Sequence, residues 1–260
     1  MSETEDGGEG RAPEGDGWRP SELESRRFGV TFGILETGRG RTQWRNAVAS
    51  ADRSGVQVLS ARIDAGEIAQ VQELEGLGFR LVDTLVYHRL SLPSPAASPN
   101  GADGEAAEVR FLDQQDAEAC SSIARVAFDK YLGRYHADPR LSDVAATDAY
   151  ADWAGRLLSE PSEGRLALGA VEAGRLTGFI IGGRSEPGTS EIILNAVEPA
   201  QQGRGTYRRL LEAYVTHASI LGADRVITST QLRNMRVQGI WADAGFRLFH
   251  SILTLHRWAD

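Results

Sequence analysis

The order of predicted strands and helices in the second half of the chain constrains the fold more than any other feature. Between Val109 and Trp258, the apolar spacing predicts a strand, two helices, three strands, a helix, a strand, a helix and a last strand. The segment Ala173-Gly174-Arg175 is typical of a hairpin turn between two of these strands. We therefore expect residues 108–260 to form a mixed domain of the α/β (α+β) class.

A shorter block, residues 18–92, also alternates strands and helices, and it resembles the end of the longer block. Gly-Phe-Arg-Leu occurs at 78–81 and again at 245–248, each time after a strand and a helix and before a long strand. This recurrence indicates an internal duplication, with a chance match of four residues as the alternative. We expect residues 18–92 to form a degenerate half-domain ahead of a complete one.

Two acidic stretches lie outside these blocks. Residues 1–17 contain six acidic residues and one arginine, and residues 93–108 contain three acidic residues and no basic one. Together they account for the formal charge of −8. Both lack the regular apolar residues that offset chain entropy, which predicts a disordered tail at 1–17 and a linker at 93–107. The two blocks themselves are close to neutral, so the acidity does not argue against an anionic ligand.

Composition also bounds the setting of the protein. Cys120 is the one cysteine, which excludes an intramolecular disulfide and a zinc site of several thiolates, so no metal is expected. A reducing, cytoplasmic location fits best. No apolar run is long enough for a membrane span, and residues 1–17 do not read as a signal peptide. The acidic balance argues against non-specific binding to nucleic acid.

A glycine-containing loop carries the strongest chemical signal. Residues 202–207 read Gln-Gly-Arg-Gly-Thr-Tyr between a predicted strand and a strongly amphipathic helix. Glycines let backbone N–H groups turn toward a ligand, and a helix N-terminus adds partial positive charge, which together suit a pyrophosphate. Arg204 would add a full charge. Taken alone, the loop is equally typical of a solvated turn.

The loop resembles the acetyl-CoA pyrophosphate loop of the GCN5-related N-acetyltransferases (GNAT), in which Gln or Arg precedes Gly by three residues and Gly or Ala by five. Gln202 and Gly205 match this pattern, and Tyr207 departs from it. Residues 193–197 are similar to the family's fourth strand, and Asn234, Trp241 and Gly245-Phe246 continue the family spacing with Trp in place of the usual Tyr.

The resemblance implies the GNAT fold, a mixed and mostly antiparallel sheet whose central strands splay apart to admit the pantetheine arm. It implies acetyl-CoA as the acyl donor and a small-molecule amine as the partner, with a homodimer left open. The residues it implies for binding acetyl-CoA are Ala196, Val197, Gln202, Gly203, Arg204, Gly205, Thr206 and Asn234. Asn234 is also expected to cap the helix that it begins.

A closer resemblance is to the dTDP-fucosamine acetyltransferase group of this family. Residues 23–29 look like the opening segment of that group, and Arg134, Tyr135 and Asp138 fall in an order similar to its segment over the acceptor. This implies acetyl transfer to a nucleotide-linked amino sugar, with those three residues at the substrate. Another small amine, a protein N-terminus, or a catalytically silent acyl-CoA-binding module remain the alternatives.

Acetyl transfer requires a polarised thioester, a neutral amine and a stabilised thiolate. Backbone N–H groups near residues 195–197 are expected to polarise the carbonyl, and Glu191 or Asn195 to hold the water that takes the amine proton. Glu191 as a simple exposed carboxylate is the alternative. Trp241 can donate a hydrogen bond but not a proton, unlike the family's Tyr. Tyr207, Tyr135 and Tyr131 are the candidates to replace that acid, with protonation of the thiolate by solvent and loss of activity as the alternatives.

Overall fold

The computed structural model describes residues 17–37, 41–92, 108–129, 131, 133–160 and 162–259. The predicted tail, apart from Gly17, and the predicted linker at 93–107 lie outside these residues. Within the described residues, no helix is both long and apolar enough to cross a membrane.

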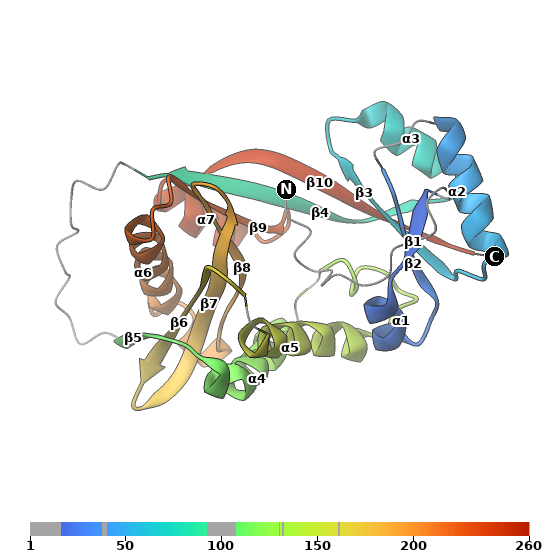
Figure 1. Ribbon diagram of the computed structural model, residues 1–260. Coiled ribbons are helices and arrows are strands. Elements are labelled where there is room, and N and C mark those ends of the chain that lie inside the picture. Colours follow the sequence, from blue (N-terminus) through green and yellow to red (C-terminus); the bar gives the residue numbers. More distant parts are fainter. Residues whose placement is uncertain are drawn as a thin grey trace.

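The described residues form ten strands and seven α-helices (Figure 1). The elements of the second block follow the order that the sequence predicts. The elements of the first block are β1 (Trp18–Pro20), α1 (Glu22–Phe28), β2 (Phe32–Leu35), α2 (Arg41–Arg53), β3 (Val58–Asp64), α3 (Ile68–Gly76) and β4 (Arg80–Ser91). Those of the second are β5 (Glu108–Phe111), α4 (Ala117–Phe128), α5 (Asp143–Ser159), β6 (Arg165–Glu172), β7 (Arg175–Glu186), β8 (Thr189–Val197), α6 (Thr206–Ile220), β9 (Arg225–Gln231), α7 (Met235–Asp243) and β10 (Arg247–Trp258).

All ten strands join one sheet, in the order β1-β2-β3-β10-β4-β9-β8-β7-β6-β5. Two neighbouring pairs, β2 with β3 and β8 with β9, are parallel, and the other pairs are antiparallel. The mixed, mostly antiparallel sheet expected from the sequence is therefore confirmed.

The two blocks exchange their last strands. β10, at the end of the second block, lies between β3 and β4 of the first, and β4 lies between β10 and β9 of the second. These two long strands run side by side across the middle of the molecule and connect its two ends (Figure 1). Each block therefore completes the sheet of the other, which local sequence patterns did not predict.

The repeated tetrapeptide marks a repeated structure. β3 and β9 each have 7 residues, α3 and α7 each have 9, and β4 and β10 each have 12. Gly78 and Gly245, which follow the two helices, have φ angles of 90° and 89°. In the same turn, Phe79 N–H donates to Leu74 and Phe246 N–H donates to Trp241. Trp241 therefore occupies the position that Leu74 has in the first block.

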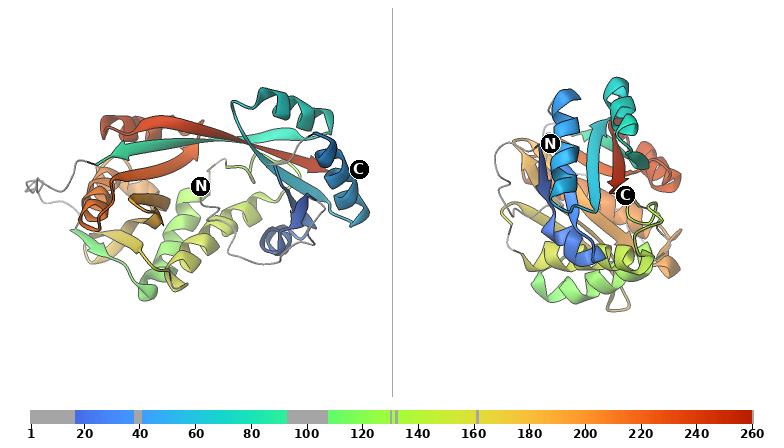
Figure 2. Two further views of the ribbon diagram at one scale, coloured as in Figure 1. Left: turned by 45° about the horizontal axis from the view of Figure 1, so that its top comes forward. Right: turned by 90° about the vertical axis from the view of Figure 1, so that its right-hand side faces the viewer.

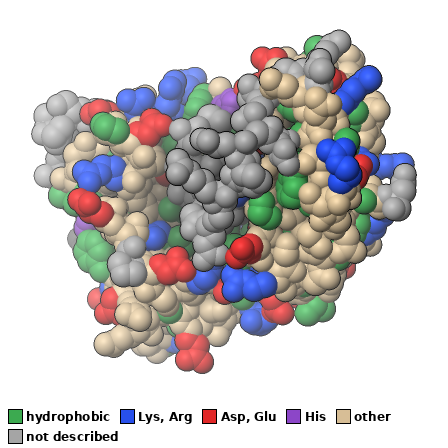
Figure 3. Space-filling model, turned by 45° about the vertical axis from the view of Figure 1, so that its right-hand side comes forward, with side chains coloured by type: hydrophobic (Ala, Val, Ile, Leu, Met, Phe, Trp, Pro, Cys, Tyr) green, Lys and Arg blue, Asp and Glu red, His purple; other side chains and the backbone are tan. Residues whose placement is uncertain are grey.

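A shared core fixes the first block against the second. One apolar cluster combines Phe32 and Val58 of the first block with Tyr135, Leu141 and Ala149 of the second. Helices α1 and α5 lie close together in both views of the molecule (Figures 1 and 2). On the face shown in Figure 3, acidic and basic side chains are interspersed rather than gathered by sign.

Candidate active site

A cavity of about 500 Å³ lies where β8 and β9 separate. The parallel pairing of the two strands ends at Ile192 and Thr228, although β8 continues to Val197 and β9 to Gln231. The ends of both strands beyond that point line the cavity. This is the splayed arrangement that the sequence predicts, and it places the β8 backbone beside an open space.

The predicted phosphate loop forms one end of the cavity. Gly203 and Gly205 both have a φ of 80°, the left-handed region that favours glycine. Gly205 is the N-cap of α6 and provides no side-chain cap, so the first backbone N–H groups of this helix remain donors for a ligand. A Cβ at Gly205 would lie 3.3 Å from Nη1 of Arg209. The loop therefore has the open backbone that a pyrophosphate requires.

Basic side chains surround this loop, and the sequence indicated only some of them. Arg236 Nη1 donates to Oε1 of Gln202 at 3.3 Å, and both residues line the cavity. Arg208 lines it too and pairs with Asp243 at 3.2 Å. Arg204 is exposed and is not among the lining residues. The local sequence around Arg236 did not indicate a role in the site, because only the packing of α7 beside the loop brings this side chain to the cavity.

The predicted catalytic residues of β8 face the same cavity. Glu191, Ile193 and Asn195 are half-buried, and all three line the cavity. A bulge at Ile193, between the pairs Ile181–Leu194 and Gly182–Ile192, interrupts the alternation of side chains along the strand. Ala196 and Val197 line it as well, as expected for the residues beside an acyl group. The backbone oxygen of Glu191 accepts a hydrogen bond from Tyr214 Oη at 2.9 Å, which fixes this part of the strand.

Trp241 and Tyr207 lie together in the cavity wall. Trp241 is 0% exposed, and its indole Nε1 donates to Tyr207 Oη at 2.8 Å. Because the phenol oxygen is the acceptor in this bond, the Tyr207 O–H group keeps its own proton to donate. Burial raises the pKa of Tyr207 above its ordinary value of 10.0, and the Trp241 bond partly offsets that rise. Tyr207 is therefore protonated near neutral pH.

Asn234 lines the cavity but does not cap α7. It occupies the N-cap position without a capping hydrogen bond, and its Nδ2 instead donates to Thr230 Oγ1 at 2.9 Å. The expected cap is wrong, because the backbone at Asn234 (φ −79°, ψ 61°) is not the extended conformation of a capping residue. The side chain ties the start of α7 to the end of β9.

Of the three residues expected at the acceptor, the structure brings only Arg134 to the cavity. Tyr135 is 4% exposed and donates to Glu24 Oε1 at 2.7 Å. Asp138 is also 4% exposed, and it accepts from His256 Nδ1 at 2.7 Å and Trp258 Nε1 at 2.9 Å. Although burial opposes ionisation, these hydrogen bonds lower the pKa of Asp138. Tyr135 and Asp138 thus join the loop after α4 to α1 and β10.

Residues of the first block line the opposite end of the cavity, and the sequence did not indicate them. They are Arg62, Asp83, Leu85 and Tyr87, beside Thr254 of β10. Aromatic rings also line the cavity: Phe128 stacks on Tyr150 with ring centroids 4.5 Å apart, and Tyr131 packs against both rings. They belong to one apolar cluster with Leu194 and Ala196 of β8. The sequence did not indicate the first-block residues because only the strand exchange places β4 next to β9, beside the cavity.

Comparisons with known proteins agree with this geometry. Residues 125–246 match the model of the acetyltransferase (GNAT) family. The fold is similar to that of a GCN5-related N-acetyltransferase from Sphaerobacter thermophilus, with 17% identity, a TM-score of 0.61, and coverage of 93% of this chain and 76% of that chain. No curated protein matched the chain.

Two further solved structures share the fold over most of the chain. A functionally unknown conserved protein from Staphylococcus epidermidis ATCC 12228 has 12% identity and a TM-score of 0.62, covering 96% of this chain and 94% of that chain. A tandem GNAT protein from the clavulanic acid biosynthesis pathway has 18% identity and a TM-score of 0.57, covering 89% and 76%.

At these identities, the solved structures show a shared fold only. The family match gives no support for the dTDP-fucosamine group. The GNAT family generally uses acetyl-CoA as donor. The phosphate loop and the splayed strands both fall within residues 125–246, the part of the chain that matches the acetyltransferase (GNAT) family model.

Proposed function

We propose that this protein transfers the acetyl group of acetyl-CoA to a primary amine inside the cavity. The observation that carries the proposal is continuity: one cavity contains the phosphate loop, the free edge of β8 and the Trp241–Tyr207 pair. The pyrophosphate would bind at residues 202–206, with Arg236 and Arg208 beside it. The pantetheine arm would pair with the β8 backbone after Ile192, where β9 no longer pairs with it.

The amine attacks the thioester directly, so that a C–N bond forms while the C–S bond breaks. Backbone N–H groups near Asn195 would stabilise the oxyanion of the intermediate. The attacking nitrogen first loses a proton to a water held by Glu191 or Asn195, which both line the cavity. The leaving sulfur receives a hydrogen bond or a proton from Tyr207, whose O–H group is kept in place by the Trp241 indole.

The acceptor proposed from the sequence is a nucleotide-linked amino sugar. Its support in the structure is the mixture of arginine, carboxylate and aromatic side chains that line the cavity. Tyr135 and Asp138 give it no support, because neither lines the cavity. Another small amine and a protein N-terminus are the competing acceptors, and a panel of amines distinguishes them.

The first experiment is calorimetric titration of the protein with acetyl-CoA, followed by measurement of thiol release with a panel of primary amines. We expect binding and amine-dependent release. The panel contains nucleotide-linked amino sugars, aminoglycosides and peptides with a free N-terminus. A protein that neither binds acetyl-CoA nor is stabilised by it would contradict the proposal.

A catalytically silent acyl-CoA-binding module is the second candidate. The observation that favours it is Trp241 at the family's Tyr position, where it is fully buried like its first-block counterpart Leu74. This candidate predicts that acetyl-CoA binds without thiol release, and that Trp241→Tyr creates turnover. Turnover by the unmodified protein excludes it.

A further inference from the structure

We propose that His88, which the first block supplies, is a positioning residue for the hydrogen bond between Trp241 and Tyr207. The inference rests on the proposed acetyl transfer, in which Tyr207 acts on the leaving sulfur, and it gives the first block a part in that step. His88 lies on β4 and is 6% exposed. It is not among the residues that line the cavity, so it would act on the reaction only through its neighbours.

The imidazole of His88 packs against the indole of Trp241. The two ring centroids are 5.2 Å apart, and the ring planes meet at 57°. Phe246 is a second ring beside Trp241, with 6.5 Å between the centroids. Centroid separations of this size are those of attractive aromatic contacts. His88 is therefore the closer of these two rings that hold the indole.

The orientation of the indole matters because its Nε1 atom donates to Tyr207 Oη at 2.8 Å. An indole has one N–H group, so a rotation of the ring would break this bond and release the phenol. The hydrogen bond from Phe246 N–H to the Trp241 carbonyl fixes the backbone there, but not the side-chain torsions. One ring contact and one hydrogen bond thus connect His88 to the proposed acid.

The sheet holds His88 at the level where β8 and β9 separate. His88 pairs with Leu248 of β10 on one side and with Thr228 of β9 on the other. Thr228 in turn pairs with Ile192, the last pair before β8 and β9 part. These four residues form one row across β10, β4, β9 and β8, in a hydrogen-bonded part of the sheet. His88 therefore keeps a fixed position relative to the splayed strands.

The first block has leucines at the two equivalent positions. Trp241 corresponds to Leu74, as described above. On β10, Leu255 corresponds to His88, because each of them pairs with the last leucine of the repeated tetrapeptide on the neighbouring strand. Leu74 and Leu255 are both 0% exposed and belong to one apolar cluster. Leucine is therefore sufficient for packing at this place in the repeat, whereas the block with the cavity has Trp241 and His88.

His88 acts through geometry, because its ring is uncharged at neutral pH. Burial lowers the pKa of His88 below the ordinary value of 6.5, and the Val86 backbone only partly offsets this effect. A neutral imidazole brings no charge near Tyr207, whose own pKa is raised by burial. The contact thus holds the indole in place and leaves the phenol protonated.

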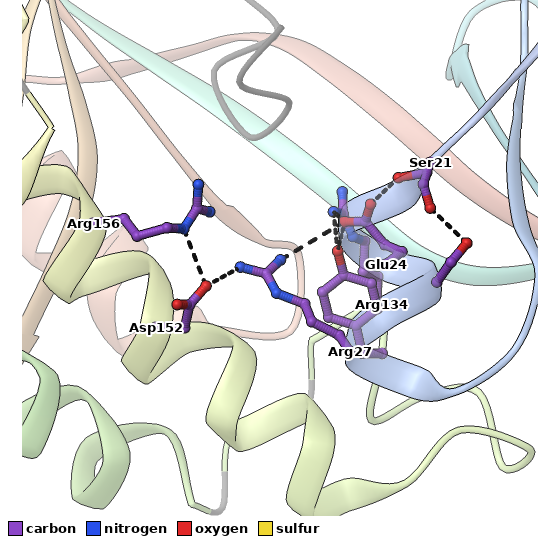
Figure 4. Close-up of polar contacts among 8 residues, drawn as sticks. Ser21, Glu24, Arg27, Arg134, Asp152 and Arg156 are labelled. Atoms are coloured by element: carbon purple, nitrogen blue, oxygen red, sulfur yellow. Dashed lines mark hydrogen bonds and ion pairs between the residues drawn. The ribbon is translucent and has the colours of Figure 1, made fainter. Parts of the chain in front are cut away.

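Helix α1 docks the first block on the second at a separate place. Glu24 faces Arg27 and Arg134, and Arg27 also pairs with Asp152 of α5 at 2.7 Å (Figure 4). The position of His88 depends instead on the strands on either side of β4. Weaker docking of α1 and loss of the His88 ring are therefore separate changes, and an Arg27 variant distinguishes them.

The first experiment is a double-mutant cycle on the full chain, with acetyl-CoA and an amine that supports turnover. His88→Leu should lower kcat about tenfold or more and leave the Kd for acetyl-CoA unchanged, because a displaced phenol meets the leaving sulfur poorly. In a Tyr207→Phe background, His88→Leu should change kcat by less than about twofold, since the group that it positions is already absent. His88→Phe keeps a ring against the indole and should retain most of kcat.

Two control variants test for less specific effects. His217→Leu removes a half-buried histidine from a comparable ring contact, with Phe111 at 4.7 Å between centroids, about 15 Å along α6 from Tyr207. Arg27→Gln weakens the docking of α1. Both should leave kcat within about twofold of the unmodified protein. An equal loss of kcat in either control, or a full effect of His88→Leu in the Tyr207→Phe background, would overturn the positioning role and leave acetyl transfer standing.

A second measurement needs no turnover, so it decides the inference even if no amine is acetylated. The indole N–H signal of Trp241 is identified in NMR spectra by its loss in Trp241→Phe, and its exchange with solvent deuterium is followed. Exchange should be slow in the unmodified protein and in His88→Phe, and about tenfold or more faster in His88→Leu, because the bond to Tyr207 is lost.

His88→Leu is expected to fold, because Leu255 occupies the equivalent position of the first block. If it does not fold, His88→Gln removes the ring and is measured in the same way. An exchange rate of the Trp241 indole that stays unchanged in a folded variant without the ring would overturn the inference.

Discussion

At the scale of single residues, two aromatic side chains stand where one tyrosine is usual in the GNAT family. Trp241 cannot supply a proton, but its indole orients the phenol of Tyr207, which can. Tyr207 is also the residue that departs from the loop pattern at the last position. In the proposed transfer, Tyr207 takes over the role of the usual tyrosine, because its side chain and that of Trp241 meet in the same cavity wall.

Tyr207→Phe should lower kcat about 100-fold or more, the size of a lost general acid, while the Kd for acetyl-CoA stays unchanged. Steady-state kinetics with calorimetry measures both quantities. Tyr131→Phe is the comparison, because Tyr131 lines the same cavity with its ring against Phe128 and Tyr150. A large loss of kcat in Tyr131→Phe and none in Tyr207→Phe would assign the acid to Tyr131 instead.

Gly205→Val should weaken acetyl-CoA binding, because a side chain at a φ of 80° closes the backbone approach to the pyrophosphate. The left-handed backbone alone costs about 1–2 kcal/mol of stability with such a residue. Gly222→Val is the matched control, since Gly222 has a φ of 86° and no neighbour that a Cβ would meet. Calorimetry should show reduced affinity for acetyl-CoA only in Gly205→Val. Equal affinity in both variants would mean that the pyrophosphate does not bind at this loop.

The buried carboxylate of Glu24 should make folding sensitive to acid. Burial opposes its ionisation, but Arg134, Ser21 and Tyr135 together lower its pKa below 4.5. The unfolded chain therefore binds more protons than the folded chain below pH 4.5, so this stabilisation is present above that pH and is lost as pH falls through the folded pKa.

Glu24→Gln should lower the free energy of unfolding by about 1–3 kcal/mol at neutral pH, the cost of weakened charged hydrogen bonds. It should also reduce the dependence of stability on pH below 4.5. Urea denaturation at neutral and acidic pH measures both effects. An unchanged pH dependence in the variant would mean that Glu24 is not ionised in the folded protein.

At the scale of elements, the separation of β8 from β9 is the feature that makes a donor site. Both strands pair normally up to Ile192 and Thr228, and α6 begins soon after β8 with an uncapped N-terminus. The sequence predicted this arrangement well, because the loop, the amphipathic helix and the strand residues all follow one another in the chain. Its geometry depends on contacts close in sequence.

Binding of acetyl-CoA should slow amide hydrogen exchange in residues 193–197 of β8, where the donor would pair with the backbone. The amides of Thr189–Ile192 are the internal control, because β9 already lies against that part of the strand. Exchange measured by mass spectrometry, with and without acetyl-CoA, reports the difference. Protection of both segments to the same degree would indicate general stiffening instead of backbone pairing.

At the scale of the whole molecule, exchange of β4 and β10 makes the two blocks interdependent. The sequence revealed the repeat through Gly78 and Gly245. It did not reveal which copy each strand joins, because the pairing of strands far apart in the chain depends on tertiary contacts. For the same reason, the sequence did not indicate that Arg62 and Asp83 line the cavity, whereas Tyr135, expected there from a resemblance in residue order, does not line it.

A chain reduced to residues 108–260 should not fold to a stable domain, because β10 would lose both of its partner strands and β9 would lose β4. Co-expression of residues 1–92 with residues 93–260 should restore a complex that elutes together in size-exclusion chromatography. A stable 108–260 fragment that binds acetyl-CoA would contradict this interdependence.

The most direct test of acetyl transfer is the stoichiometry of the products. In a reaction of the full chain with acetyl-CoA and an amine that supports turnover, free CoA thiol and N-acetylated amine are quantified together, the latter by mass spectrometry. Transfer in this cavity predicts equal amounts of the two products, with the rate of both lowered in Tyr207→Phe. Binding of acetyl-CoA with neither product formed from any amine of the panel would contradict it.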